Sequence, residues 1–352
     1  MSIATAQPKK LRQAYTLVEL LVVMAALTVL AAVLLPSIKS LMHDQKVAAA
    51  SRMVKAHIEA AQARAIAGNS PVAVILERDA APVNMVMRLS IGQVFPPYEG
   101  DLTGTTGVLG PVGGPYYNTL TVNVGEATLL SNSVGMFTAG DYLQLDDRQS
   151  IYSVQSVNNG VITFENPSPG QEADLLASSR INNTARFRLY RKPTKSFLQT
   201  LTLPRGTCVD LSVSGLGPSG NQFATTATGQ ATIVFNPQGR IAYWDNGVDV
   251  PQPATSLLHI LVGRTEQVAT NLDLTDPQND LMRVADPDDS STFNSNINDP
   301  NNTWLTVNPF TGAISSSGVQ AGGVAGNDLA AFLARLQTAR AFATYGITQS
   351  ER

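Results

Sequence analysis

Residues 15–35 form an apolar run that contains a single charged residue, Glu19. As an α-helix, these 21 residues would span roughly 30 Å, the thickness of the hydrocarbon core of a bilayer. Lys9, Lys10 and Arg12 precede the run, and no acidic residue accompanies them. Positive charge on one flank of such a helix keeps that flank in the cytoplasm. We therefore predict a transmembrane helix over residues 15–35, with the rest of the chain delivered across the membrane.

The helical pattern continues beyond Pro36. An apolar stripe at helical spacing lines this second half: Val47, Val54, Ile58, Ala61 and Ala65. Gly68 and Pro71 follow as a stop signal. Pro36 removes one backbone hydrogen bond and can kink the helix where its two halves meet. A secretory signal peptide would have a shorter apolar core and a small-residue cleavage site, which does not follow here. We expect one helix over residues 15–67, embedded in its first half and amphipathic in its second.

A second pattern overlaps the start of the apolar run. The basic leader is followed by Ala14, by Tyr15 and then by the letters TLVELLV, in which Glu19 is the fifth residue after the Ala14–Tyr15 bond. This arrangement, with Pro36 at the expected distance, resembles the processing signal of type IV pilins and type II secretion pseudopilins. The resemblance implies that prepilin peptidase cleaves between Ala14 and Tyr15 on the cytoplasmic side and methylates the Tyr15 amine. Those families usually carry Gly and Phe at these two positions, so the chain departs from the pattern there.

Glu19 is costly in a membrane segment, because an ionised carboxylate in the bilayer loses a few kcal/mol of hydration. The resemblance implies a compensating partner, namely the free N-terminal amine of a neighbouring subunit, which would also set the axial register of assembly. The alternative is that Glu19 extends to the lipid headgroups, since it lies close to the start of the helix. We predict an assembly role for Glu19 and Pro36.

Beyond the helix, short β-like runs are separated by Gly, Pro, Asn and Asp. They include PVAVILE at 71–77, ATIVFN at 231–236 and SLLHILVG at 256–263. A sheet packed on the apolar stripe would bury both surfaces. We predict an α+β fold in which the long N-terminal helix packs on a pilin-like antiparallel β-sheet head, formed by residues 68–91 and 183–315.

Four segments bring the head closer to one branch of these families. They are ARAIAGNSPVAVILE at 63–77, LPRGTCVDLS at 203–212, IVFNPQGRI at 233–241 and WLTVNPFTGAIS at 304–315. Their order along the chain resembles that of H-type minor pseudopilins and FimT-like minor pilins. Each turn is weak evidence by itself, because N-P-x-G turns are common in β proteins. A generic pseudopilin or minor pilin is the alternative.

Residues 92–182 do not fit a minimal head of this kind and resemble an insertion. They begin with a Gly/Pro-rich stretch at 100–118, and β-like runs follow, with an Asn158-Asn159-Gly160 hairpin signal between two of them. We predict a small inserted β subdomain. Its role is open between decoration and a surface that contacts a substrate or partner, since insertions on a rigid scaffold often carry binding.

Two further stretches are distinctive. Residues 273–302 are rich in Asp and Asn and are predicted to form a solvated loop; a calcium site is the alternative, although the EF-hand spacing is missing. Residues 316–352 form a C-terminal tail, and residues 327–346 within it show apolar residues at helical spacing after a candidate N-cap, Asn327. We predict a C-terminal helix that docks on the head, with partner binding as the alternative.

No catalytic constellation is present. Motifs of serine hydrolases, zinc proteases and P-loop enzymes are missing, and Cys208 lies alone in a predicted strand as a small core residue. His43, His57 and His259 are too scattered for a metal centre. The net charge of -3 gives no footprint for nucleic acid. We therefore predict no enzyme activity, no cofactor, no metal and no nucleic-acid partner.

The resemblance implies a structural function. The expectation is a minor pseudopilin of a type II secretion system, with residues 1–14 as the cleaved cytoplasmic leader. It would be a single-pass protein of the bacterial inner membrane, with its head in the periplasm. Its implied partners are prepilin peptidase, other pseudopilins or pilins, the inner-membrane assembly platform and the lipid bilayer. The alternatives are a minor type IV pilin in adhesion, motility or DNA uptake, and a membrane-anchored periplasmic binding protein.

Overall fold

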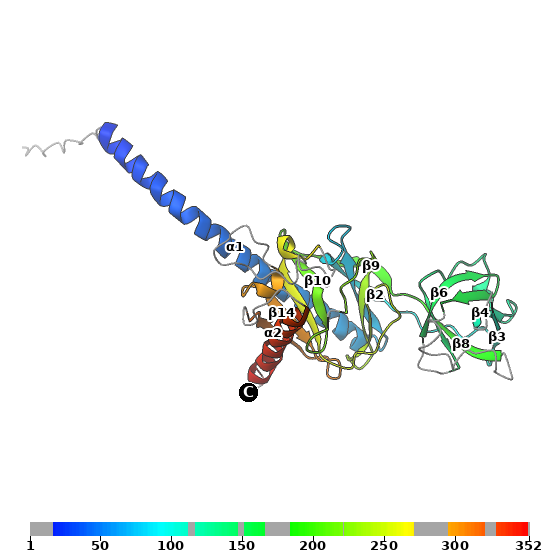
Figure 1. The fold of residues 1–352 in the computed structure, drawn as a ribbon. Helices are drawn as coiled ribbons and strands as arrows, with labels where there is room; N and C mark the ends of the chain where they lie inside the picture. Colours follow the sequence, from blue (N-terminus) through cyan, green and yellow to red (C-terminus); the bar gives the residue numbers. More distant parts are fainter. Residues whose placement is uncertain are drawn as a thin grey trace, which may run out of the picture. The chain divides into compact units, whose positions relative to one another are not determined.

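The computed structural model describes seven ranges of the chain (Figure 1): 17–111, 117–146, 151–165, 184–220, 222–270, 295–320 and 329–350. The chain divides into a unit that ends at Gln45 and a second, larger unit that begins at Lys46. Each unit is described by itself below.

Helix α1 (Leu17–Ala67) opens the described chain as one continuous helix that includes Pro36. The helix ends at Ala67, because Gly68 and Asn69 follow it and Asn69 has a positive φ of 44°. The Gly68 and Ser70 amides donate to carbonyls of the last turn, at Arg64 and Ala65. These bonds satisfy carbonyls that lack a partner within the helix.

The large unit contains a nine-stranded antiparallel sheet in the part of the chain that is described. The strands run in the order β12-β11-β1-β2-β10-β13-β14-β15, and β9 pairs with β2 beside β10. Their bounds are β1 (Val72–Arg78), β2 (Met85–Gln93), β9 (Thr194–Thr202), β10 (Thr207–Leu216), β11 (Ala231–Phe235), β12 (Ile241–Asp245), β13 (Leu258–Arg264), β14 (Thr303–Val307) and β15 (Ile314–Gly318).

Both faces of this sheet carry buried apolar side chains. One face packs against the second half of α1, and this main core includes residues of β1, β2, β10, β11, β12, β13 and β14. The other face packs against helix α2 (Leu329–Ser350), which contacts β14 and β15. Strands β10 and β11 are buried along their whole length, as expected for strands covered on both sides.

The second strand group is a closed barrel of six strands in the order β3-β4-β7-β6-β5-β8. Their bounds are β3 (Thr106–Pro111), β4 (Tyr117–Val122), β5 (Tyr142–Leu145), β6 (Ile151–Asn158), β7 (Val161–Phe164) and β8 (Thr184–Tyr190). The barrel has its own apolar core, which includes Leu120, Leu143, Ile162 and Phe187. Three short 3-10 helices complete the described elements: η1 (Thr128–Leu130), η2 (Thr265–Gln267) and η3 (Asn296–Asn298).

The predicted hairpin within this barrel is confirmed. Antiparallel strands β6 and β7 pair from Asn158 opposite Val161, so Asn159 and Gly160 form a two-residue loop. Both loop residues have a positive φ, 45° and 82°, as a type I′ turn requires. A side chain at Gly160 would also overlap the Val122 carbonyl. Glycine is therefore required here by conformation and by space.

The predicted α+β class is wrong. The described chain is mostly β, with strands in a large antiparallel sheet and in a separate closed barrel, rather than a pilin-like long helix on a small sheet. The two helices cover opposite faces of the sheet, so apolar side chains are buried on both sides of a larger sheet than a head with one covered face would hold. Strand β8 lies in the 183–315 range that was assigned to the head, and it pairs with β3 and β5 in the barrel.

Candidate assembly segment at the N-terminus

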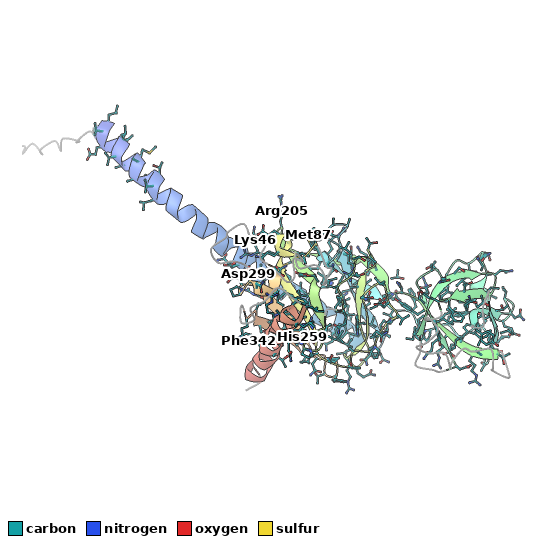
Figure 2. All side chains as sticks on the ribbon, in the orientation of Figure 1. Lys46, Met87, Arg205, His259, Asp299 and Phe342 are labelled. Carbon is teal, nitrogen blue, oxygen red and sulfur yellow. The ribbon has the colours of Figure 1, made fainter. Side chains whose placement is uncertain are left out.

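The first turns of α1 carry apolar side chains on all sides of the helix (Figure 2). Every side chain from Leu17 to Leu30 is exposed, and the exposed fraction reaches 80% at Leu17. A helix that is apolar around its whole circumference is stable only when something apolar surrounds it, such as lipid or other helices. This part of α1 therefore needs partners outside the described chain.

Polar groups within this segment are few and distinct. The Thr28 hydroxyl donates back to the helix, at 2.8 Å from the Ala25 carbonyl and 3.1 Å from the Met24 carbonyl. Such a bond satisfies the hydroxyl locally, so Thr28 is compatible with apolar surroundings. Glu19 lies in the first turn and is the only charged residue of the described stretch 17–30. A carboxylate there is favoured by the positive end of the helix dipole.

The other predicted site residues are placed only in part. Ala14 and Tyr15, the predicted cleavage pair, lie outside the described residues. Pro36 lies within α1, and its side chain is outside the described part. The backbone continues as helix through this position. The assembly roles of Glu19 and Pro36 remain predictions.

The second half of α1 differs in its surroundings from the first. Residues that line the predicted stripe are completely buried in the large unit: Val47, Val54, Ile58, Ala61 and Ala65. Arg52, Glu59 and Arg64 lie off this stripe and are exposed. Removing such side chains from water contributes about 25 cal/mol per Å² of apolar area. The second half of α1 thus supports the sheet.

Two turns that were weak signals in the sequence meet against α1. Gly239 and Gly312 end the N-P turns and have positive φ values of 77° and 75°. The Gln62 side-chain amide donates to the Gly239 carbonyl at 2.8 Å, and the Ile241 amide donates to the Pro309 carbonyl at 3.0 Å. A side chain on Gly312 would overlap Gln62 and the Gly239 carbonyl. The turns therefore attach the end of α1 to the sheet.

Cys208 and His259 occupy core positions. Burial raises the pKa of the Cys208 thiol well above its usual value, which makes the thiol unreactive. His259 contacts the Thr306 hydroxyl through Nδ1 at 3.1 Å. Burial, with a smaller contribution from the Arg340 charge, lowers the pKa of His259 to about 3. Burial and the charge of Arg64 also lower the pKa of His57.

No metal centre is found among the described residues, which contain no group of three or more His, Cys, Asp or Glu side chains suited to one. Most of the Asp/Asn-rich stretch 273–302 lies outside the described residues, which resume at Ser295. The side chain of His43 is likewise outside the described part.

Sequence reasoning missed a buried polar cluster around Asp210 in β10. One carboxylate oxygen accepts hydrogen bonds from the Ser212 amide and hydroxyl, and the other accepts from the Asn296 amide at 2.8 Å. Burial raises the pKa of Asp210 from 3.8 to about 6, against the effect of these bonds. The cluster lies where the β10–β13 pairing shifts register between Asp210 and Gly215. An aspartate inside an apolar strand was the available signal.

The C-terminal helix α2 docks through apolar residues and one arginine. Arg340 is completely buried and donates to the Val213 carbonyl at 2.6 Å and the Gly217 carbonyl at 2.9 Å. Its guanidinium lies 5.7 Å from the centre of the Trp304 ring. Burial lowers the pKa of Arg340 to about 9. Phe342, labelled in Figure 2, is 46% exposed on this helix.

Within the described residues, no helix combines the length and the hydropathy that a membrane crossing requires.

Comparison with known proteins identifies the N-terminal segment. Residues 9–35 match the prokaryotic N-terminal methylation motif, and this range contains Ala14, Tyr15 and Glu19. No curated protein and no solved structure matches the chain. The motif implies processing by prepilin peptidase, a membrane-anchored form and assembly with other pilins. The chain therefore carries the N-terminal signature of a type IV pilin-like or pseudopilin precursor.

Proposed function

We propose that this chain is a minor pseudopilin of a type II secretion system, of the H-type branch, which assembles into a periplasmic pseudopilus through the first half of α1. The observation that carries the proposal is the methylation motif at 9–35 together with the exposed apolar surface of Leu17–Leu30. A chain processed at this motif begins immediately before that surface.

The exposed segment has two environments in this proposal. Before assembly, inner-membrane lipid surrounds it and the head lies in the periplasm. After assembly, the equivalent helices of neighbouring subunits replace the lipid. Glu19 then distinguishes an assembly helix from a simple anchor, because a carboxylate in apolar surroundings is retained where an opposite charge compensates it.

The second candidate is a minor type IV pilin, which would share the processing and the helix packing. The H-type proposal is supported by the order of the turn segments, of which the two N-P turns hold the end of α1. Gene neighbours separate the two candidates: a secretion ATPase beside other pseudopilin genes supports secretion, and a retraction ATPase supports a pilus. Deletion of the gene should abolish export of secreted enzymes without a loss of twitching motility.

Mass spectrometry of the membrane-extracted protein tests the processing. The expected mature chain begins at Tyr15 and carries a methylated amine. A chain that retains Met1, in cells with active prepilin peptidase, would contradict the proposal.

Glu19→Ala tests the assembly role. We expect normal membrane insertion and a loss of filament incorporation of about tenfold or more, because each 1.4 kcal/mol is a factor of ten. Glu59→Ala is the matched control on the same helix, since Glu59 is exposed and pairs only weakly with Lys55 at 3.8 Å. Equal incorporation of both variants would contradict the assembly role and support the alternative, in which Glu19 extends to the lipid headgroups.

A further inference from the structure

Two cavities flank β12 where the barrel contacts the sheet. One, of about 420 Å³, is lined by residues of β5, β6 and β8 and by β12 and Pro251 and Pro253. The other, of about 400 Å³, is lined by β6 and β7 residues and by the segment that follows β12. Ile151 lines both cavities, so they lie next to each other at this residue.

The first cavity is lined by three tyrosines, Tyr142, Tyr190 and Tyr243, and by two prolines; Tyr142 is 3% exposed. Hydrogen bonds of the hydroxyl groups hold two of these rings in place. Tyr142 donates to the Asp245 carboxylate, and Tyr190 donates to the Gln144 side-chain oxygen at 2.8 Å. Rings that are fixed before a ligand arrives lose little conformational entropy on binding.

The segment after β12 folds back on the edge of that strand. Trp244 exchanges two backbone hydrogen bonds with Gln252, at 2.9 and 2.8 Å, on the side of β12 away from β11. Ala242 is exposed, lines the tyrosine cavity and lies at the register shift of the β11–β12 pairing. The two prolines of the cavity wall, Pro251 and Pro253, flank Gln252 and are positioned by its bonds to Trp244.

Charge distinguishes the two ends. Glu165 and Asp249 line the second cavity and are exposed, and in the described part of the chain neither cavity is lined by Lys or Arg. Lys192 lies instead over the Tyr142 ring, with Nζ 5.4 Å from the ring centre. The end at Glu165 and Asp249 thus favours a cation, and the tyrosine end favours apolar groups.

We propose that the two cavities form one groove that binds an extended, proline-containing peptide with a basic residue. Prolines would lie on the tyrosines, because proline-rich segments are already extended and dock in aromatic grooves. The basic residue would lie between Glu165 and Asp249. This site is independent of the assembly helix and gives the barrel a recognition function beyond filament formation.

The test uses the full chain in a non-ionic detergent and a fluorescein-labelled peptide of alternating prolines and leucines that ends in arginine. Fluorescence anisotropy should show saturable binding. Two altered probes separate the contributions: one has glutamine in place of arginine, and the other has alanine in place of each proline. We expect both to bind about tenfold more weakly or worse.

Variants of the chain provide the structural test. Tyr243→Leu should weaken the proline probe and keep the preference for arginine. Asp249→Asn combined with Glu165→Gln should abolish that preference. Phe310→Ala is the matched control, because Phe310 is 60% exposed and lines neither cavity. Tyrosine and control variants must show the same unfolding midpoint. Absence of saturable binding, equal binding of the alanine probe, or indifference to Tyr243→Leu would overturn the proposal.

Discussion

Asp210 should make the head less stable at neutral pH than its hydrogen bonds alone would suggest. Its pKa is raised from 3.8 to about 6, so the folded state holds a proton that the unfolded state releases between these values. A shift of about two units corresponds to about 3 kcal/mol. Because the folded-state pKa is raised, this contribution is fully present below pH 3.8 and is lost as the pH rises through about 6.

Geometry shows how the protonated carboxyl can be accommodated. Ser212 donates its hydroxyl to Asp210 in the ionised state, and a hydroxyl can rotate to accept instead. The Ser212 amide and the Asn296 amide are fixed donors. Asp210→Asn removes the carboxyl group that titrates. Its side-chain NH2 group would face one of the fixed N–H donors of Ser212 or Asn296. The unpaired donor should lower the unfolding free energy of the variant by roughly 1–3 kcal/mol at every pH. The pH-dependent effect of the Asp210 proton adds to this constant difference between wild type and variant.

Urea unfolding of the full chain in detergent, followed by tryptophan fluorescence, measures this difference. Both tryptophans, Trp244 and Trp304, lie in the large sheet, so the signal reports the head. The unfolding free energy of the wild type minus that of Asp210→Asn should fall by about 2 kcal/mol between pH 4 and pH 7.5, because the unfolded carboxyl is already partly ionised at pH 4. Glu59→Gln, at an exposed position, is the control. A difference that is constant with pH would refute the reasoning.

Two predictions concern how the helices attach to the sheet. Arg340→Met should lower the unfolding free energy by about 2–4 kcal/mol, because two buried carbonyls lose their donors; an effect under about 0.5 kcal/mol in urea unfolding would contradict this. Gly312→Ala should cost about 2 kcal/mol or more, since its φ is 75° and a side chain would overlap Gln62. Gly104→Ala is the control, with a φ of 84° but open space around it, so only about 1 kcal/mol is expected. Equal losses at the two glycines would show that contact with α1 is unimportant.

Local patterns in the chain were sufficient for features that depend on near neighbours. The helix over Leu17–Ala67 follows from apolar spacing and the Gly68 stop, and the prediction was 15–67. The Asn159-Gly160 hairpin follows from the φ values that only certain residues adopt readily. The methylation motif is local as well, and it carries the functional class.

Features that depend on distant contacts were decided by the tertiary structure. Continuous burial along β10 requires covers on both faces, and nothing within its own residues shows that α2 provides one of them. Strand β8 resembles any alternating strand, and only pairing with β3 and β5 places it in the barrel. Two common turns became a helix attachment because Gln62 lies between them.

The sequence by itself determined that this chain has an apolar N-terminal helix with a methylation motif, and that it has no recognisable catalytic motif, because both depend on residues close together in the chain. Tertiary structure alone decided the size of the sheet, the closure of the barrel, the altered pKa of Asp210 and the two cavities beside β12. Each of these depends on which residues, distant in the sequence, pack together and exclude water. Burial is a property of the folded chain, and a periodic pattern shows that a face is apolar without showing what covers it.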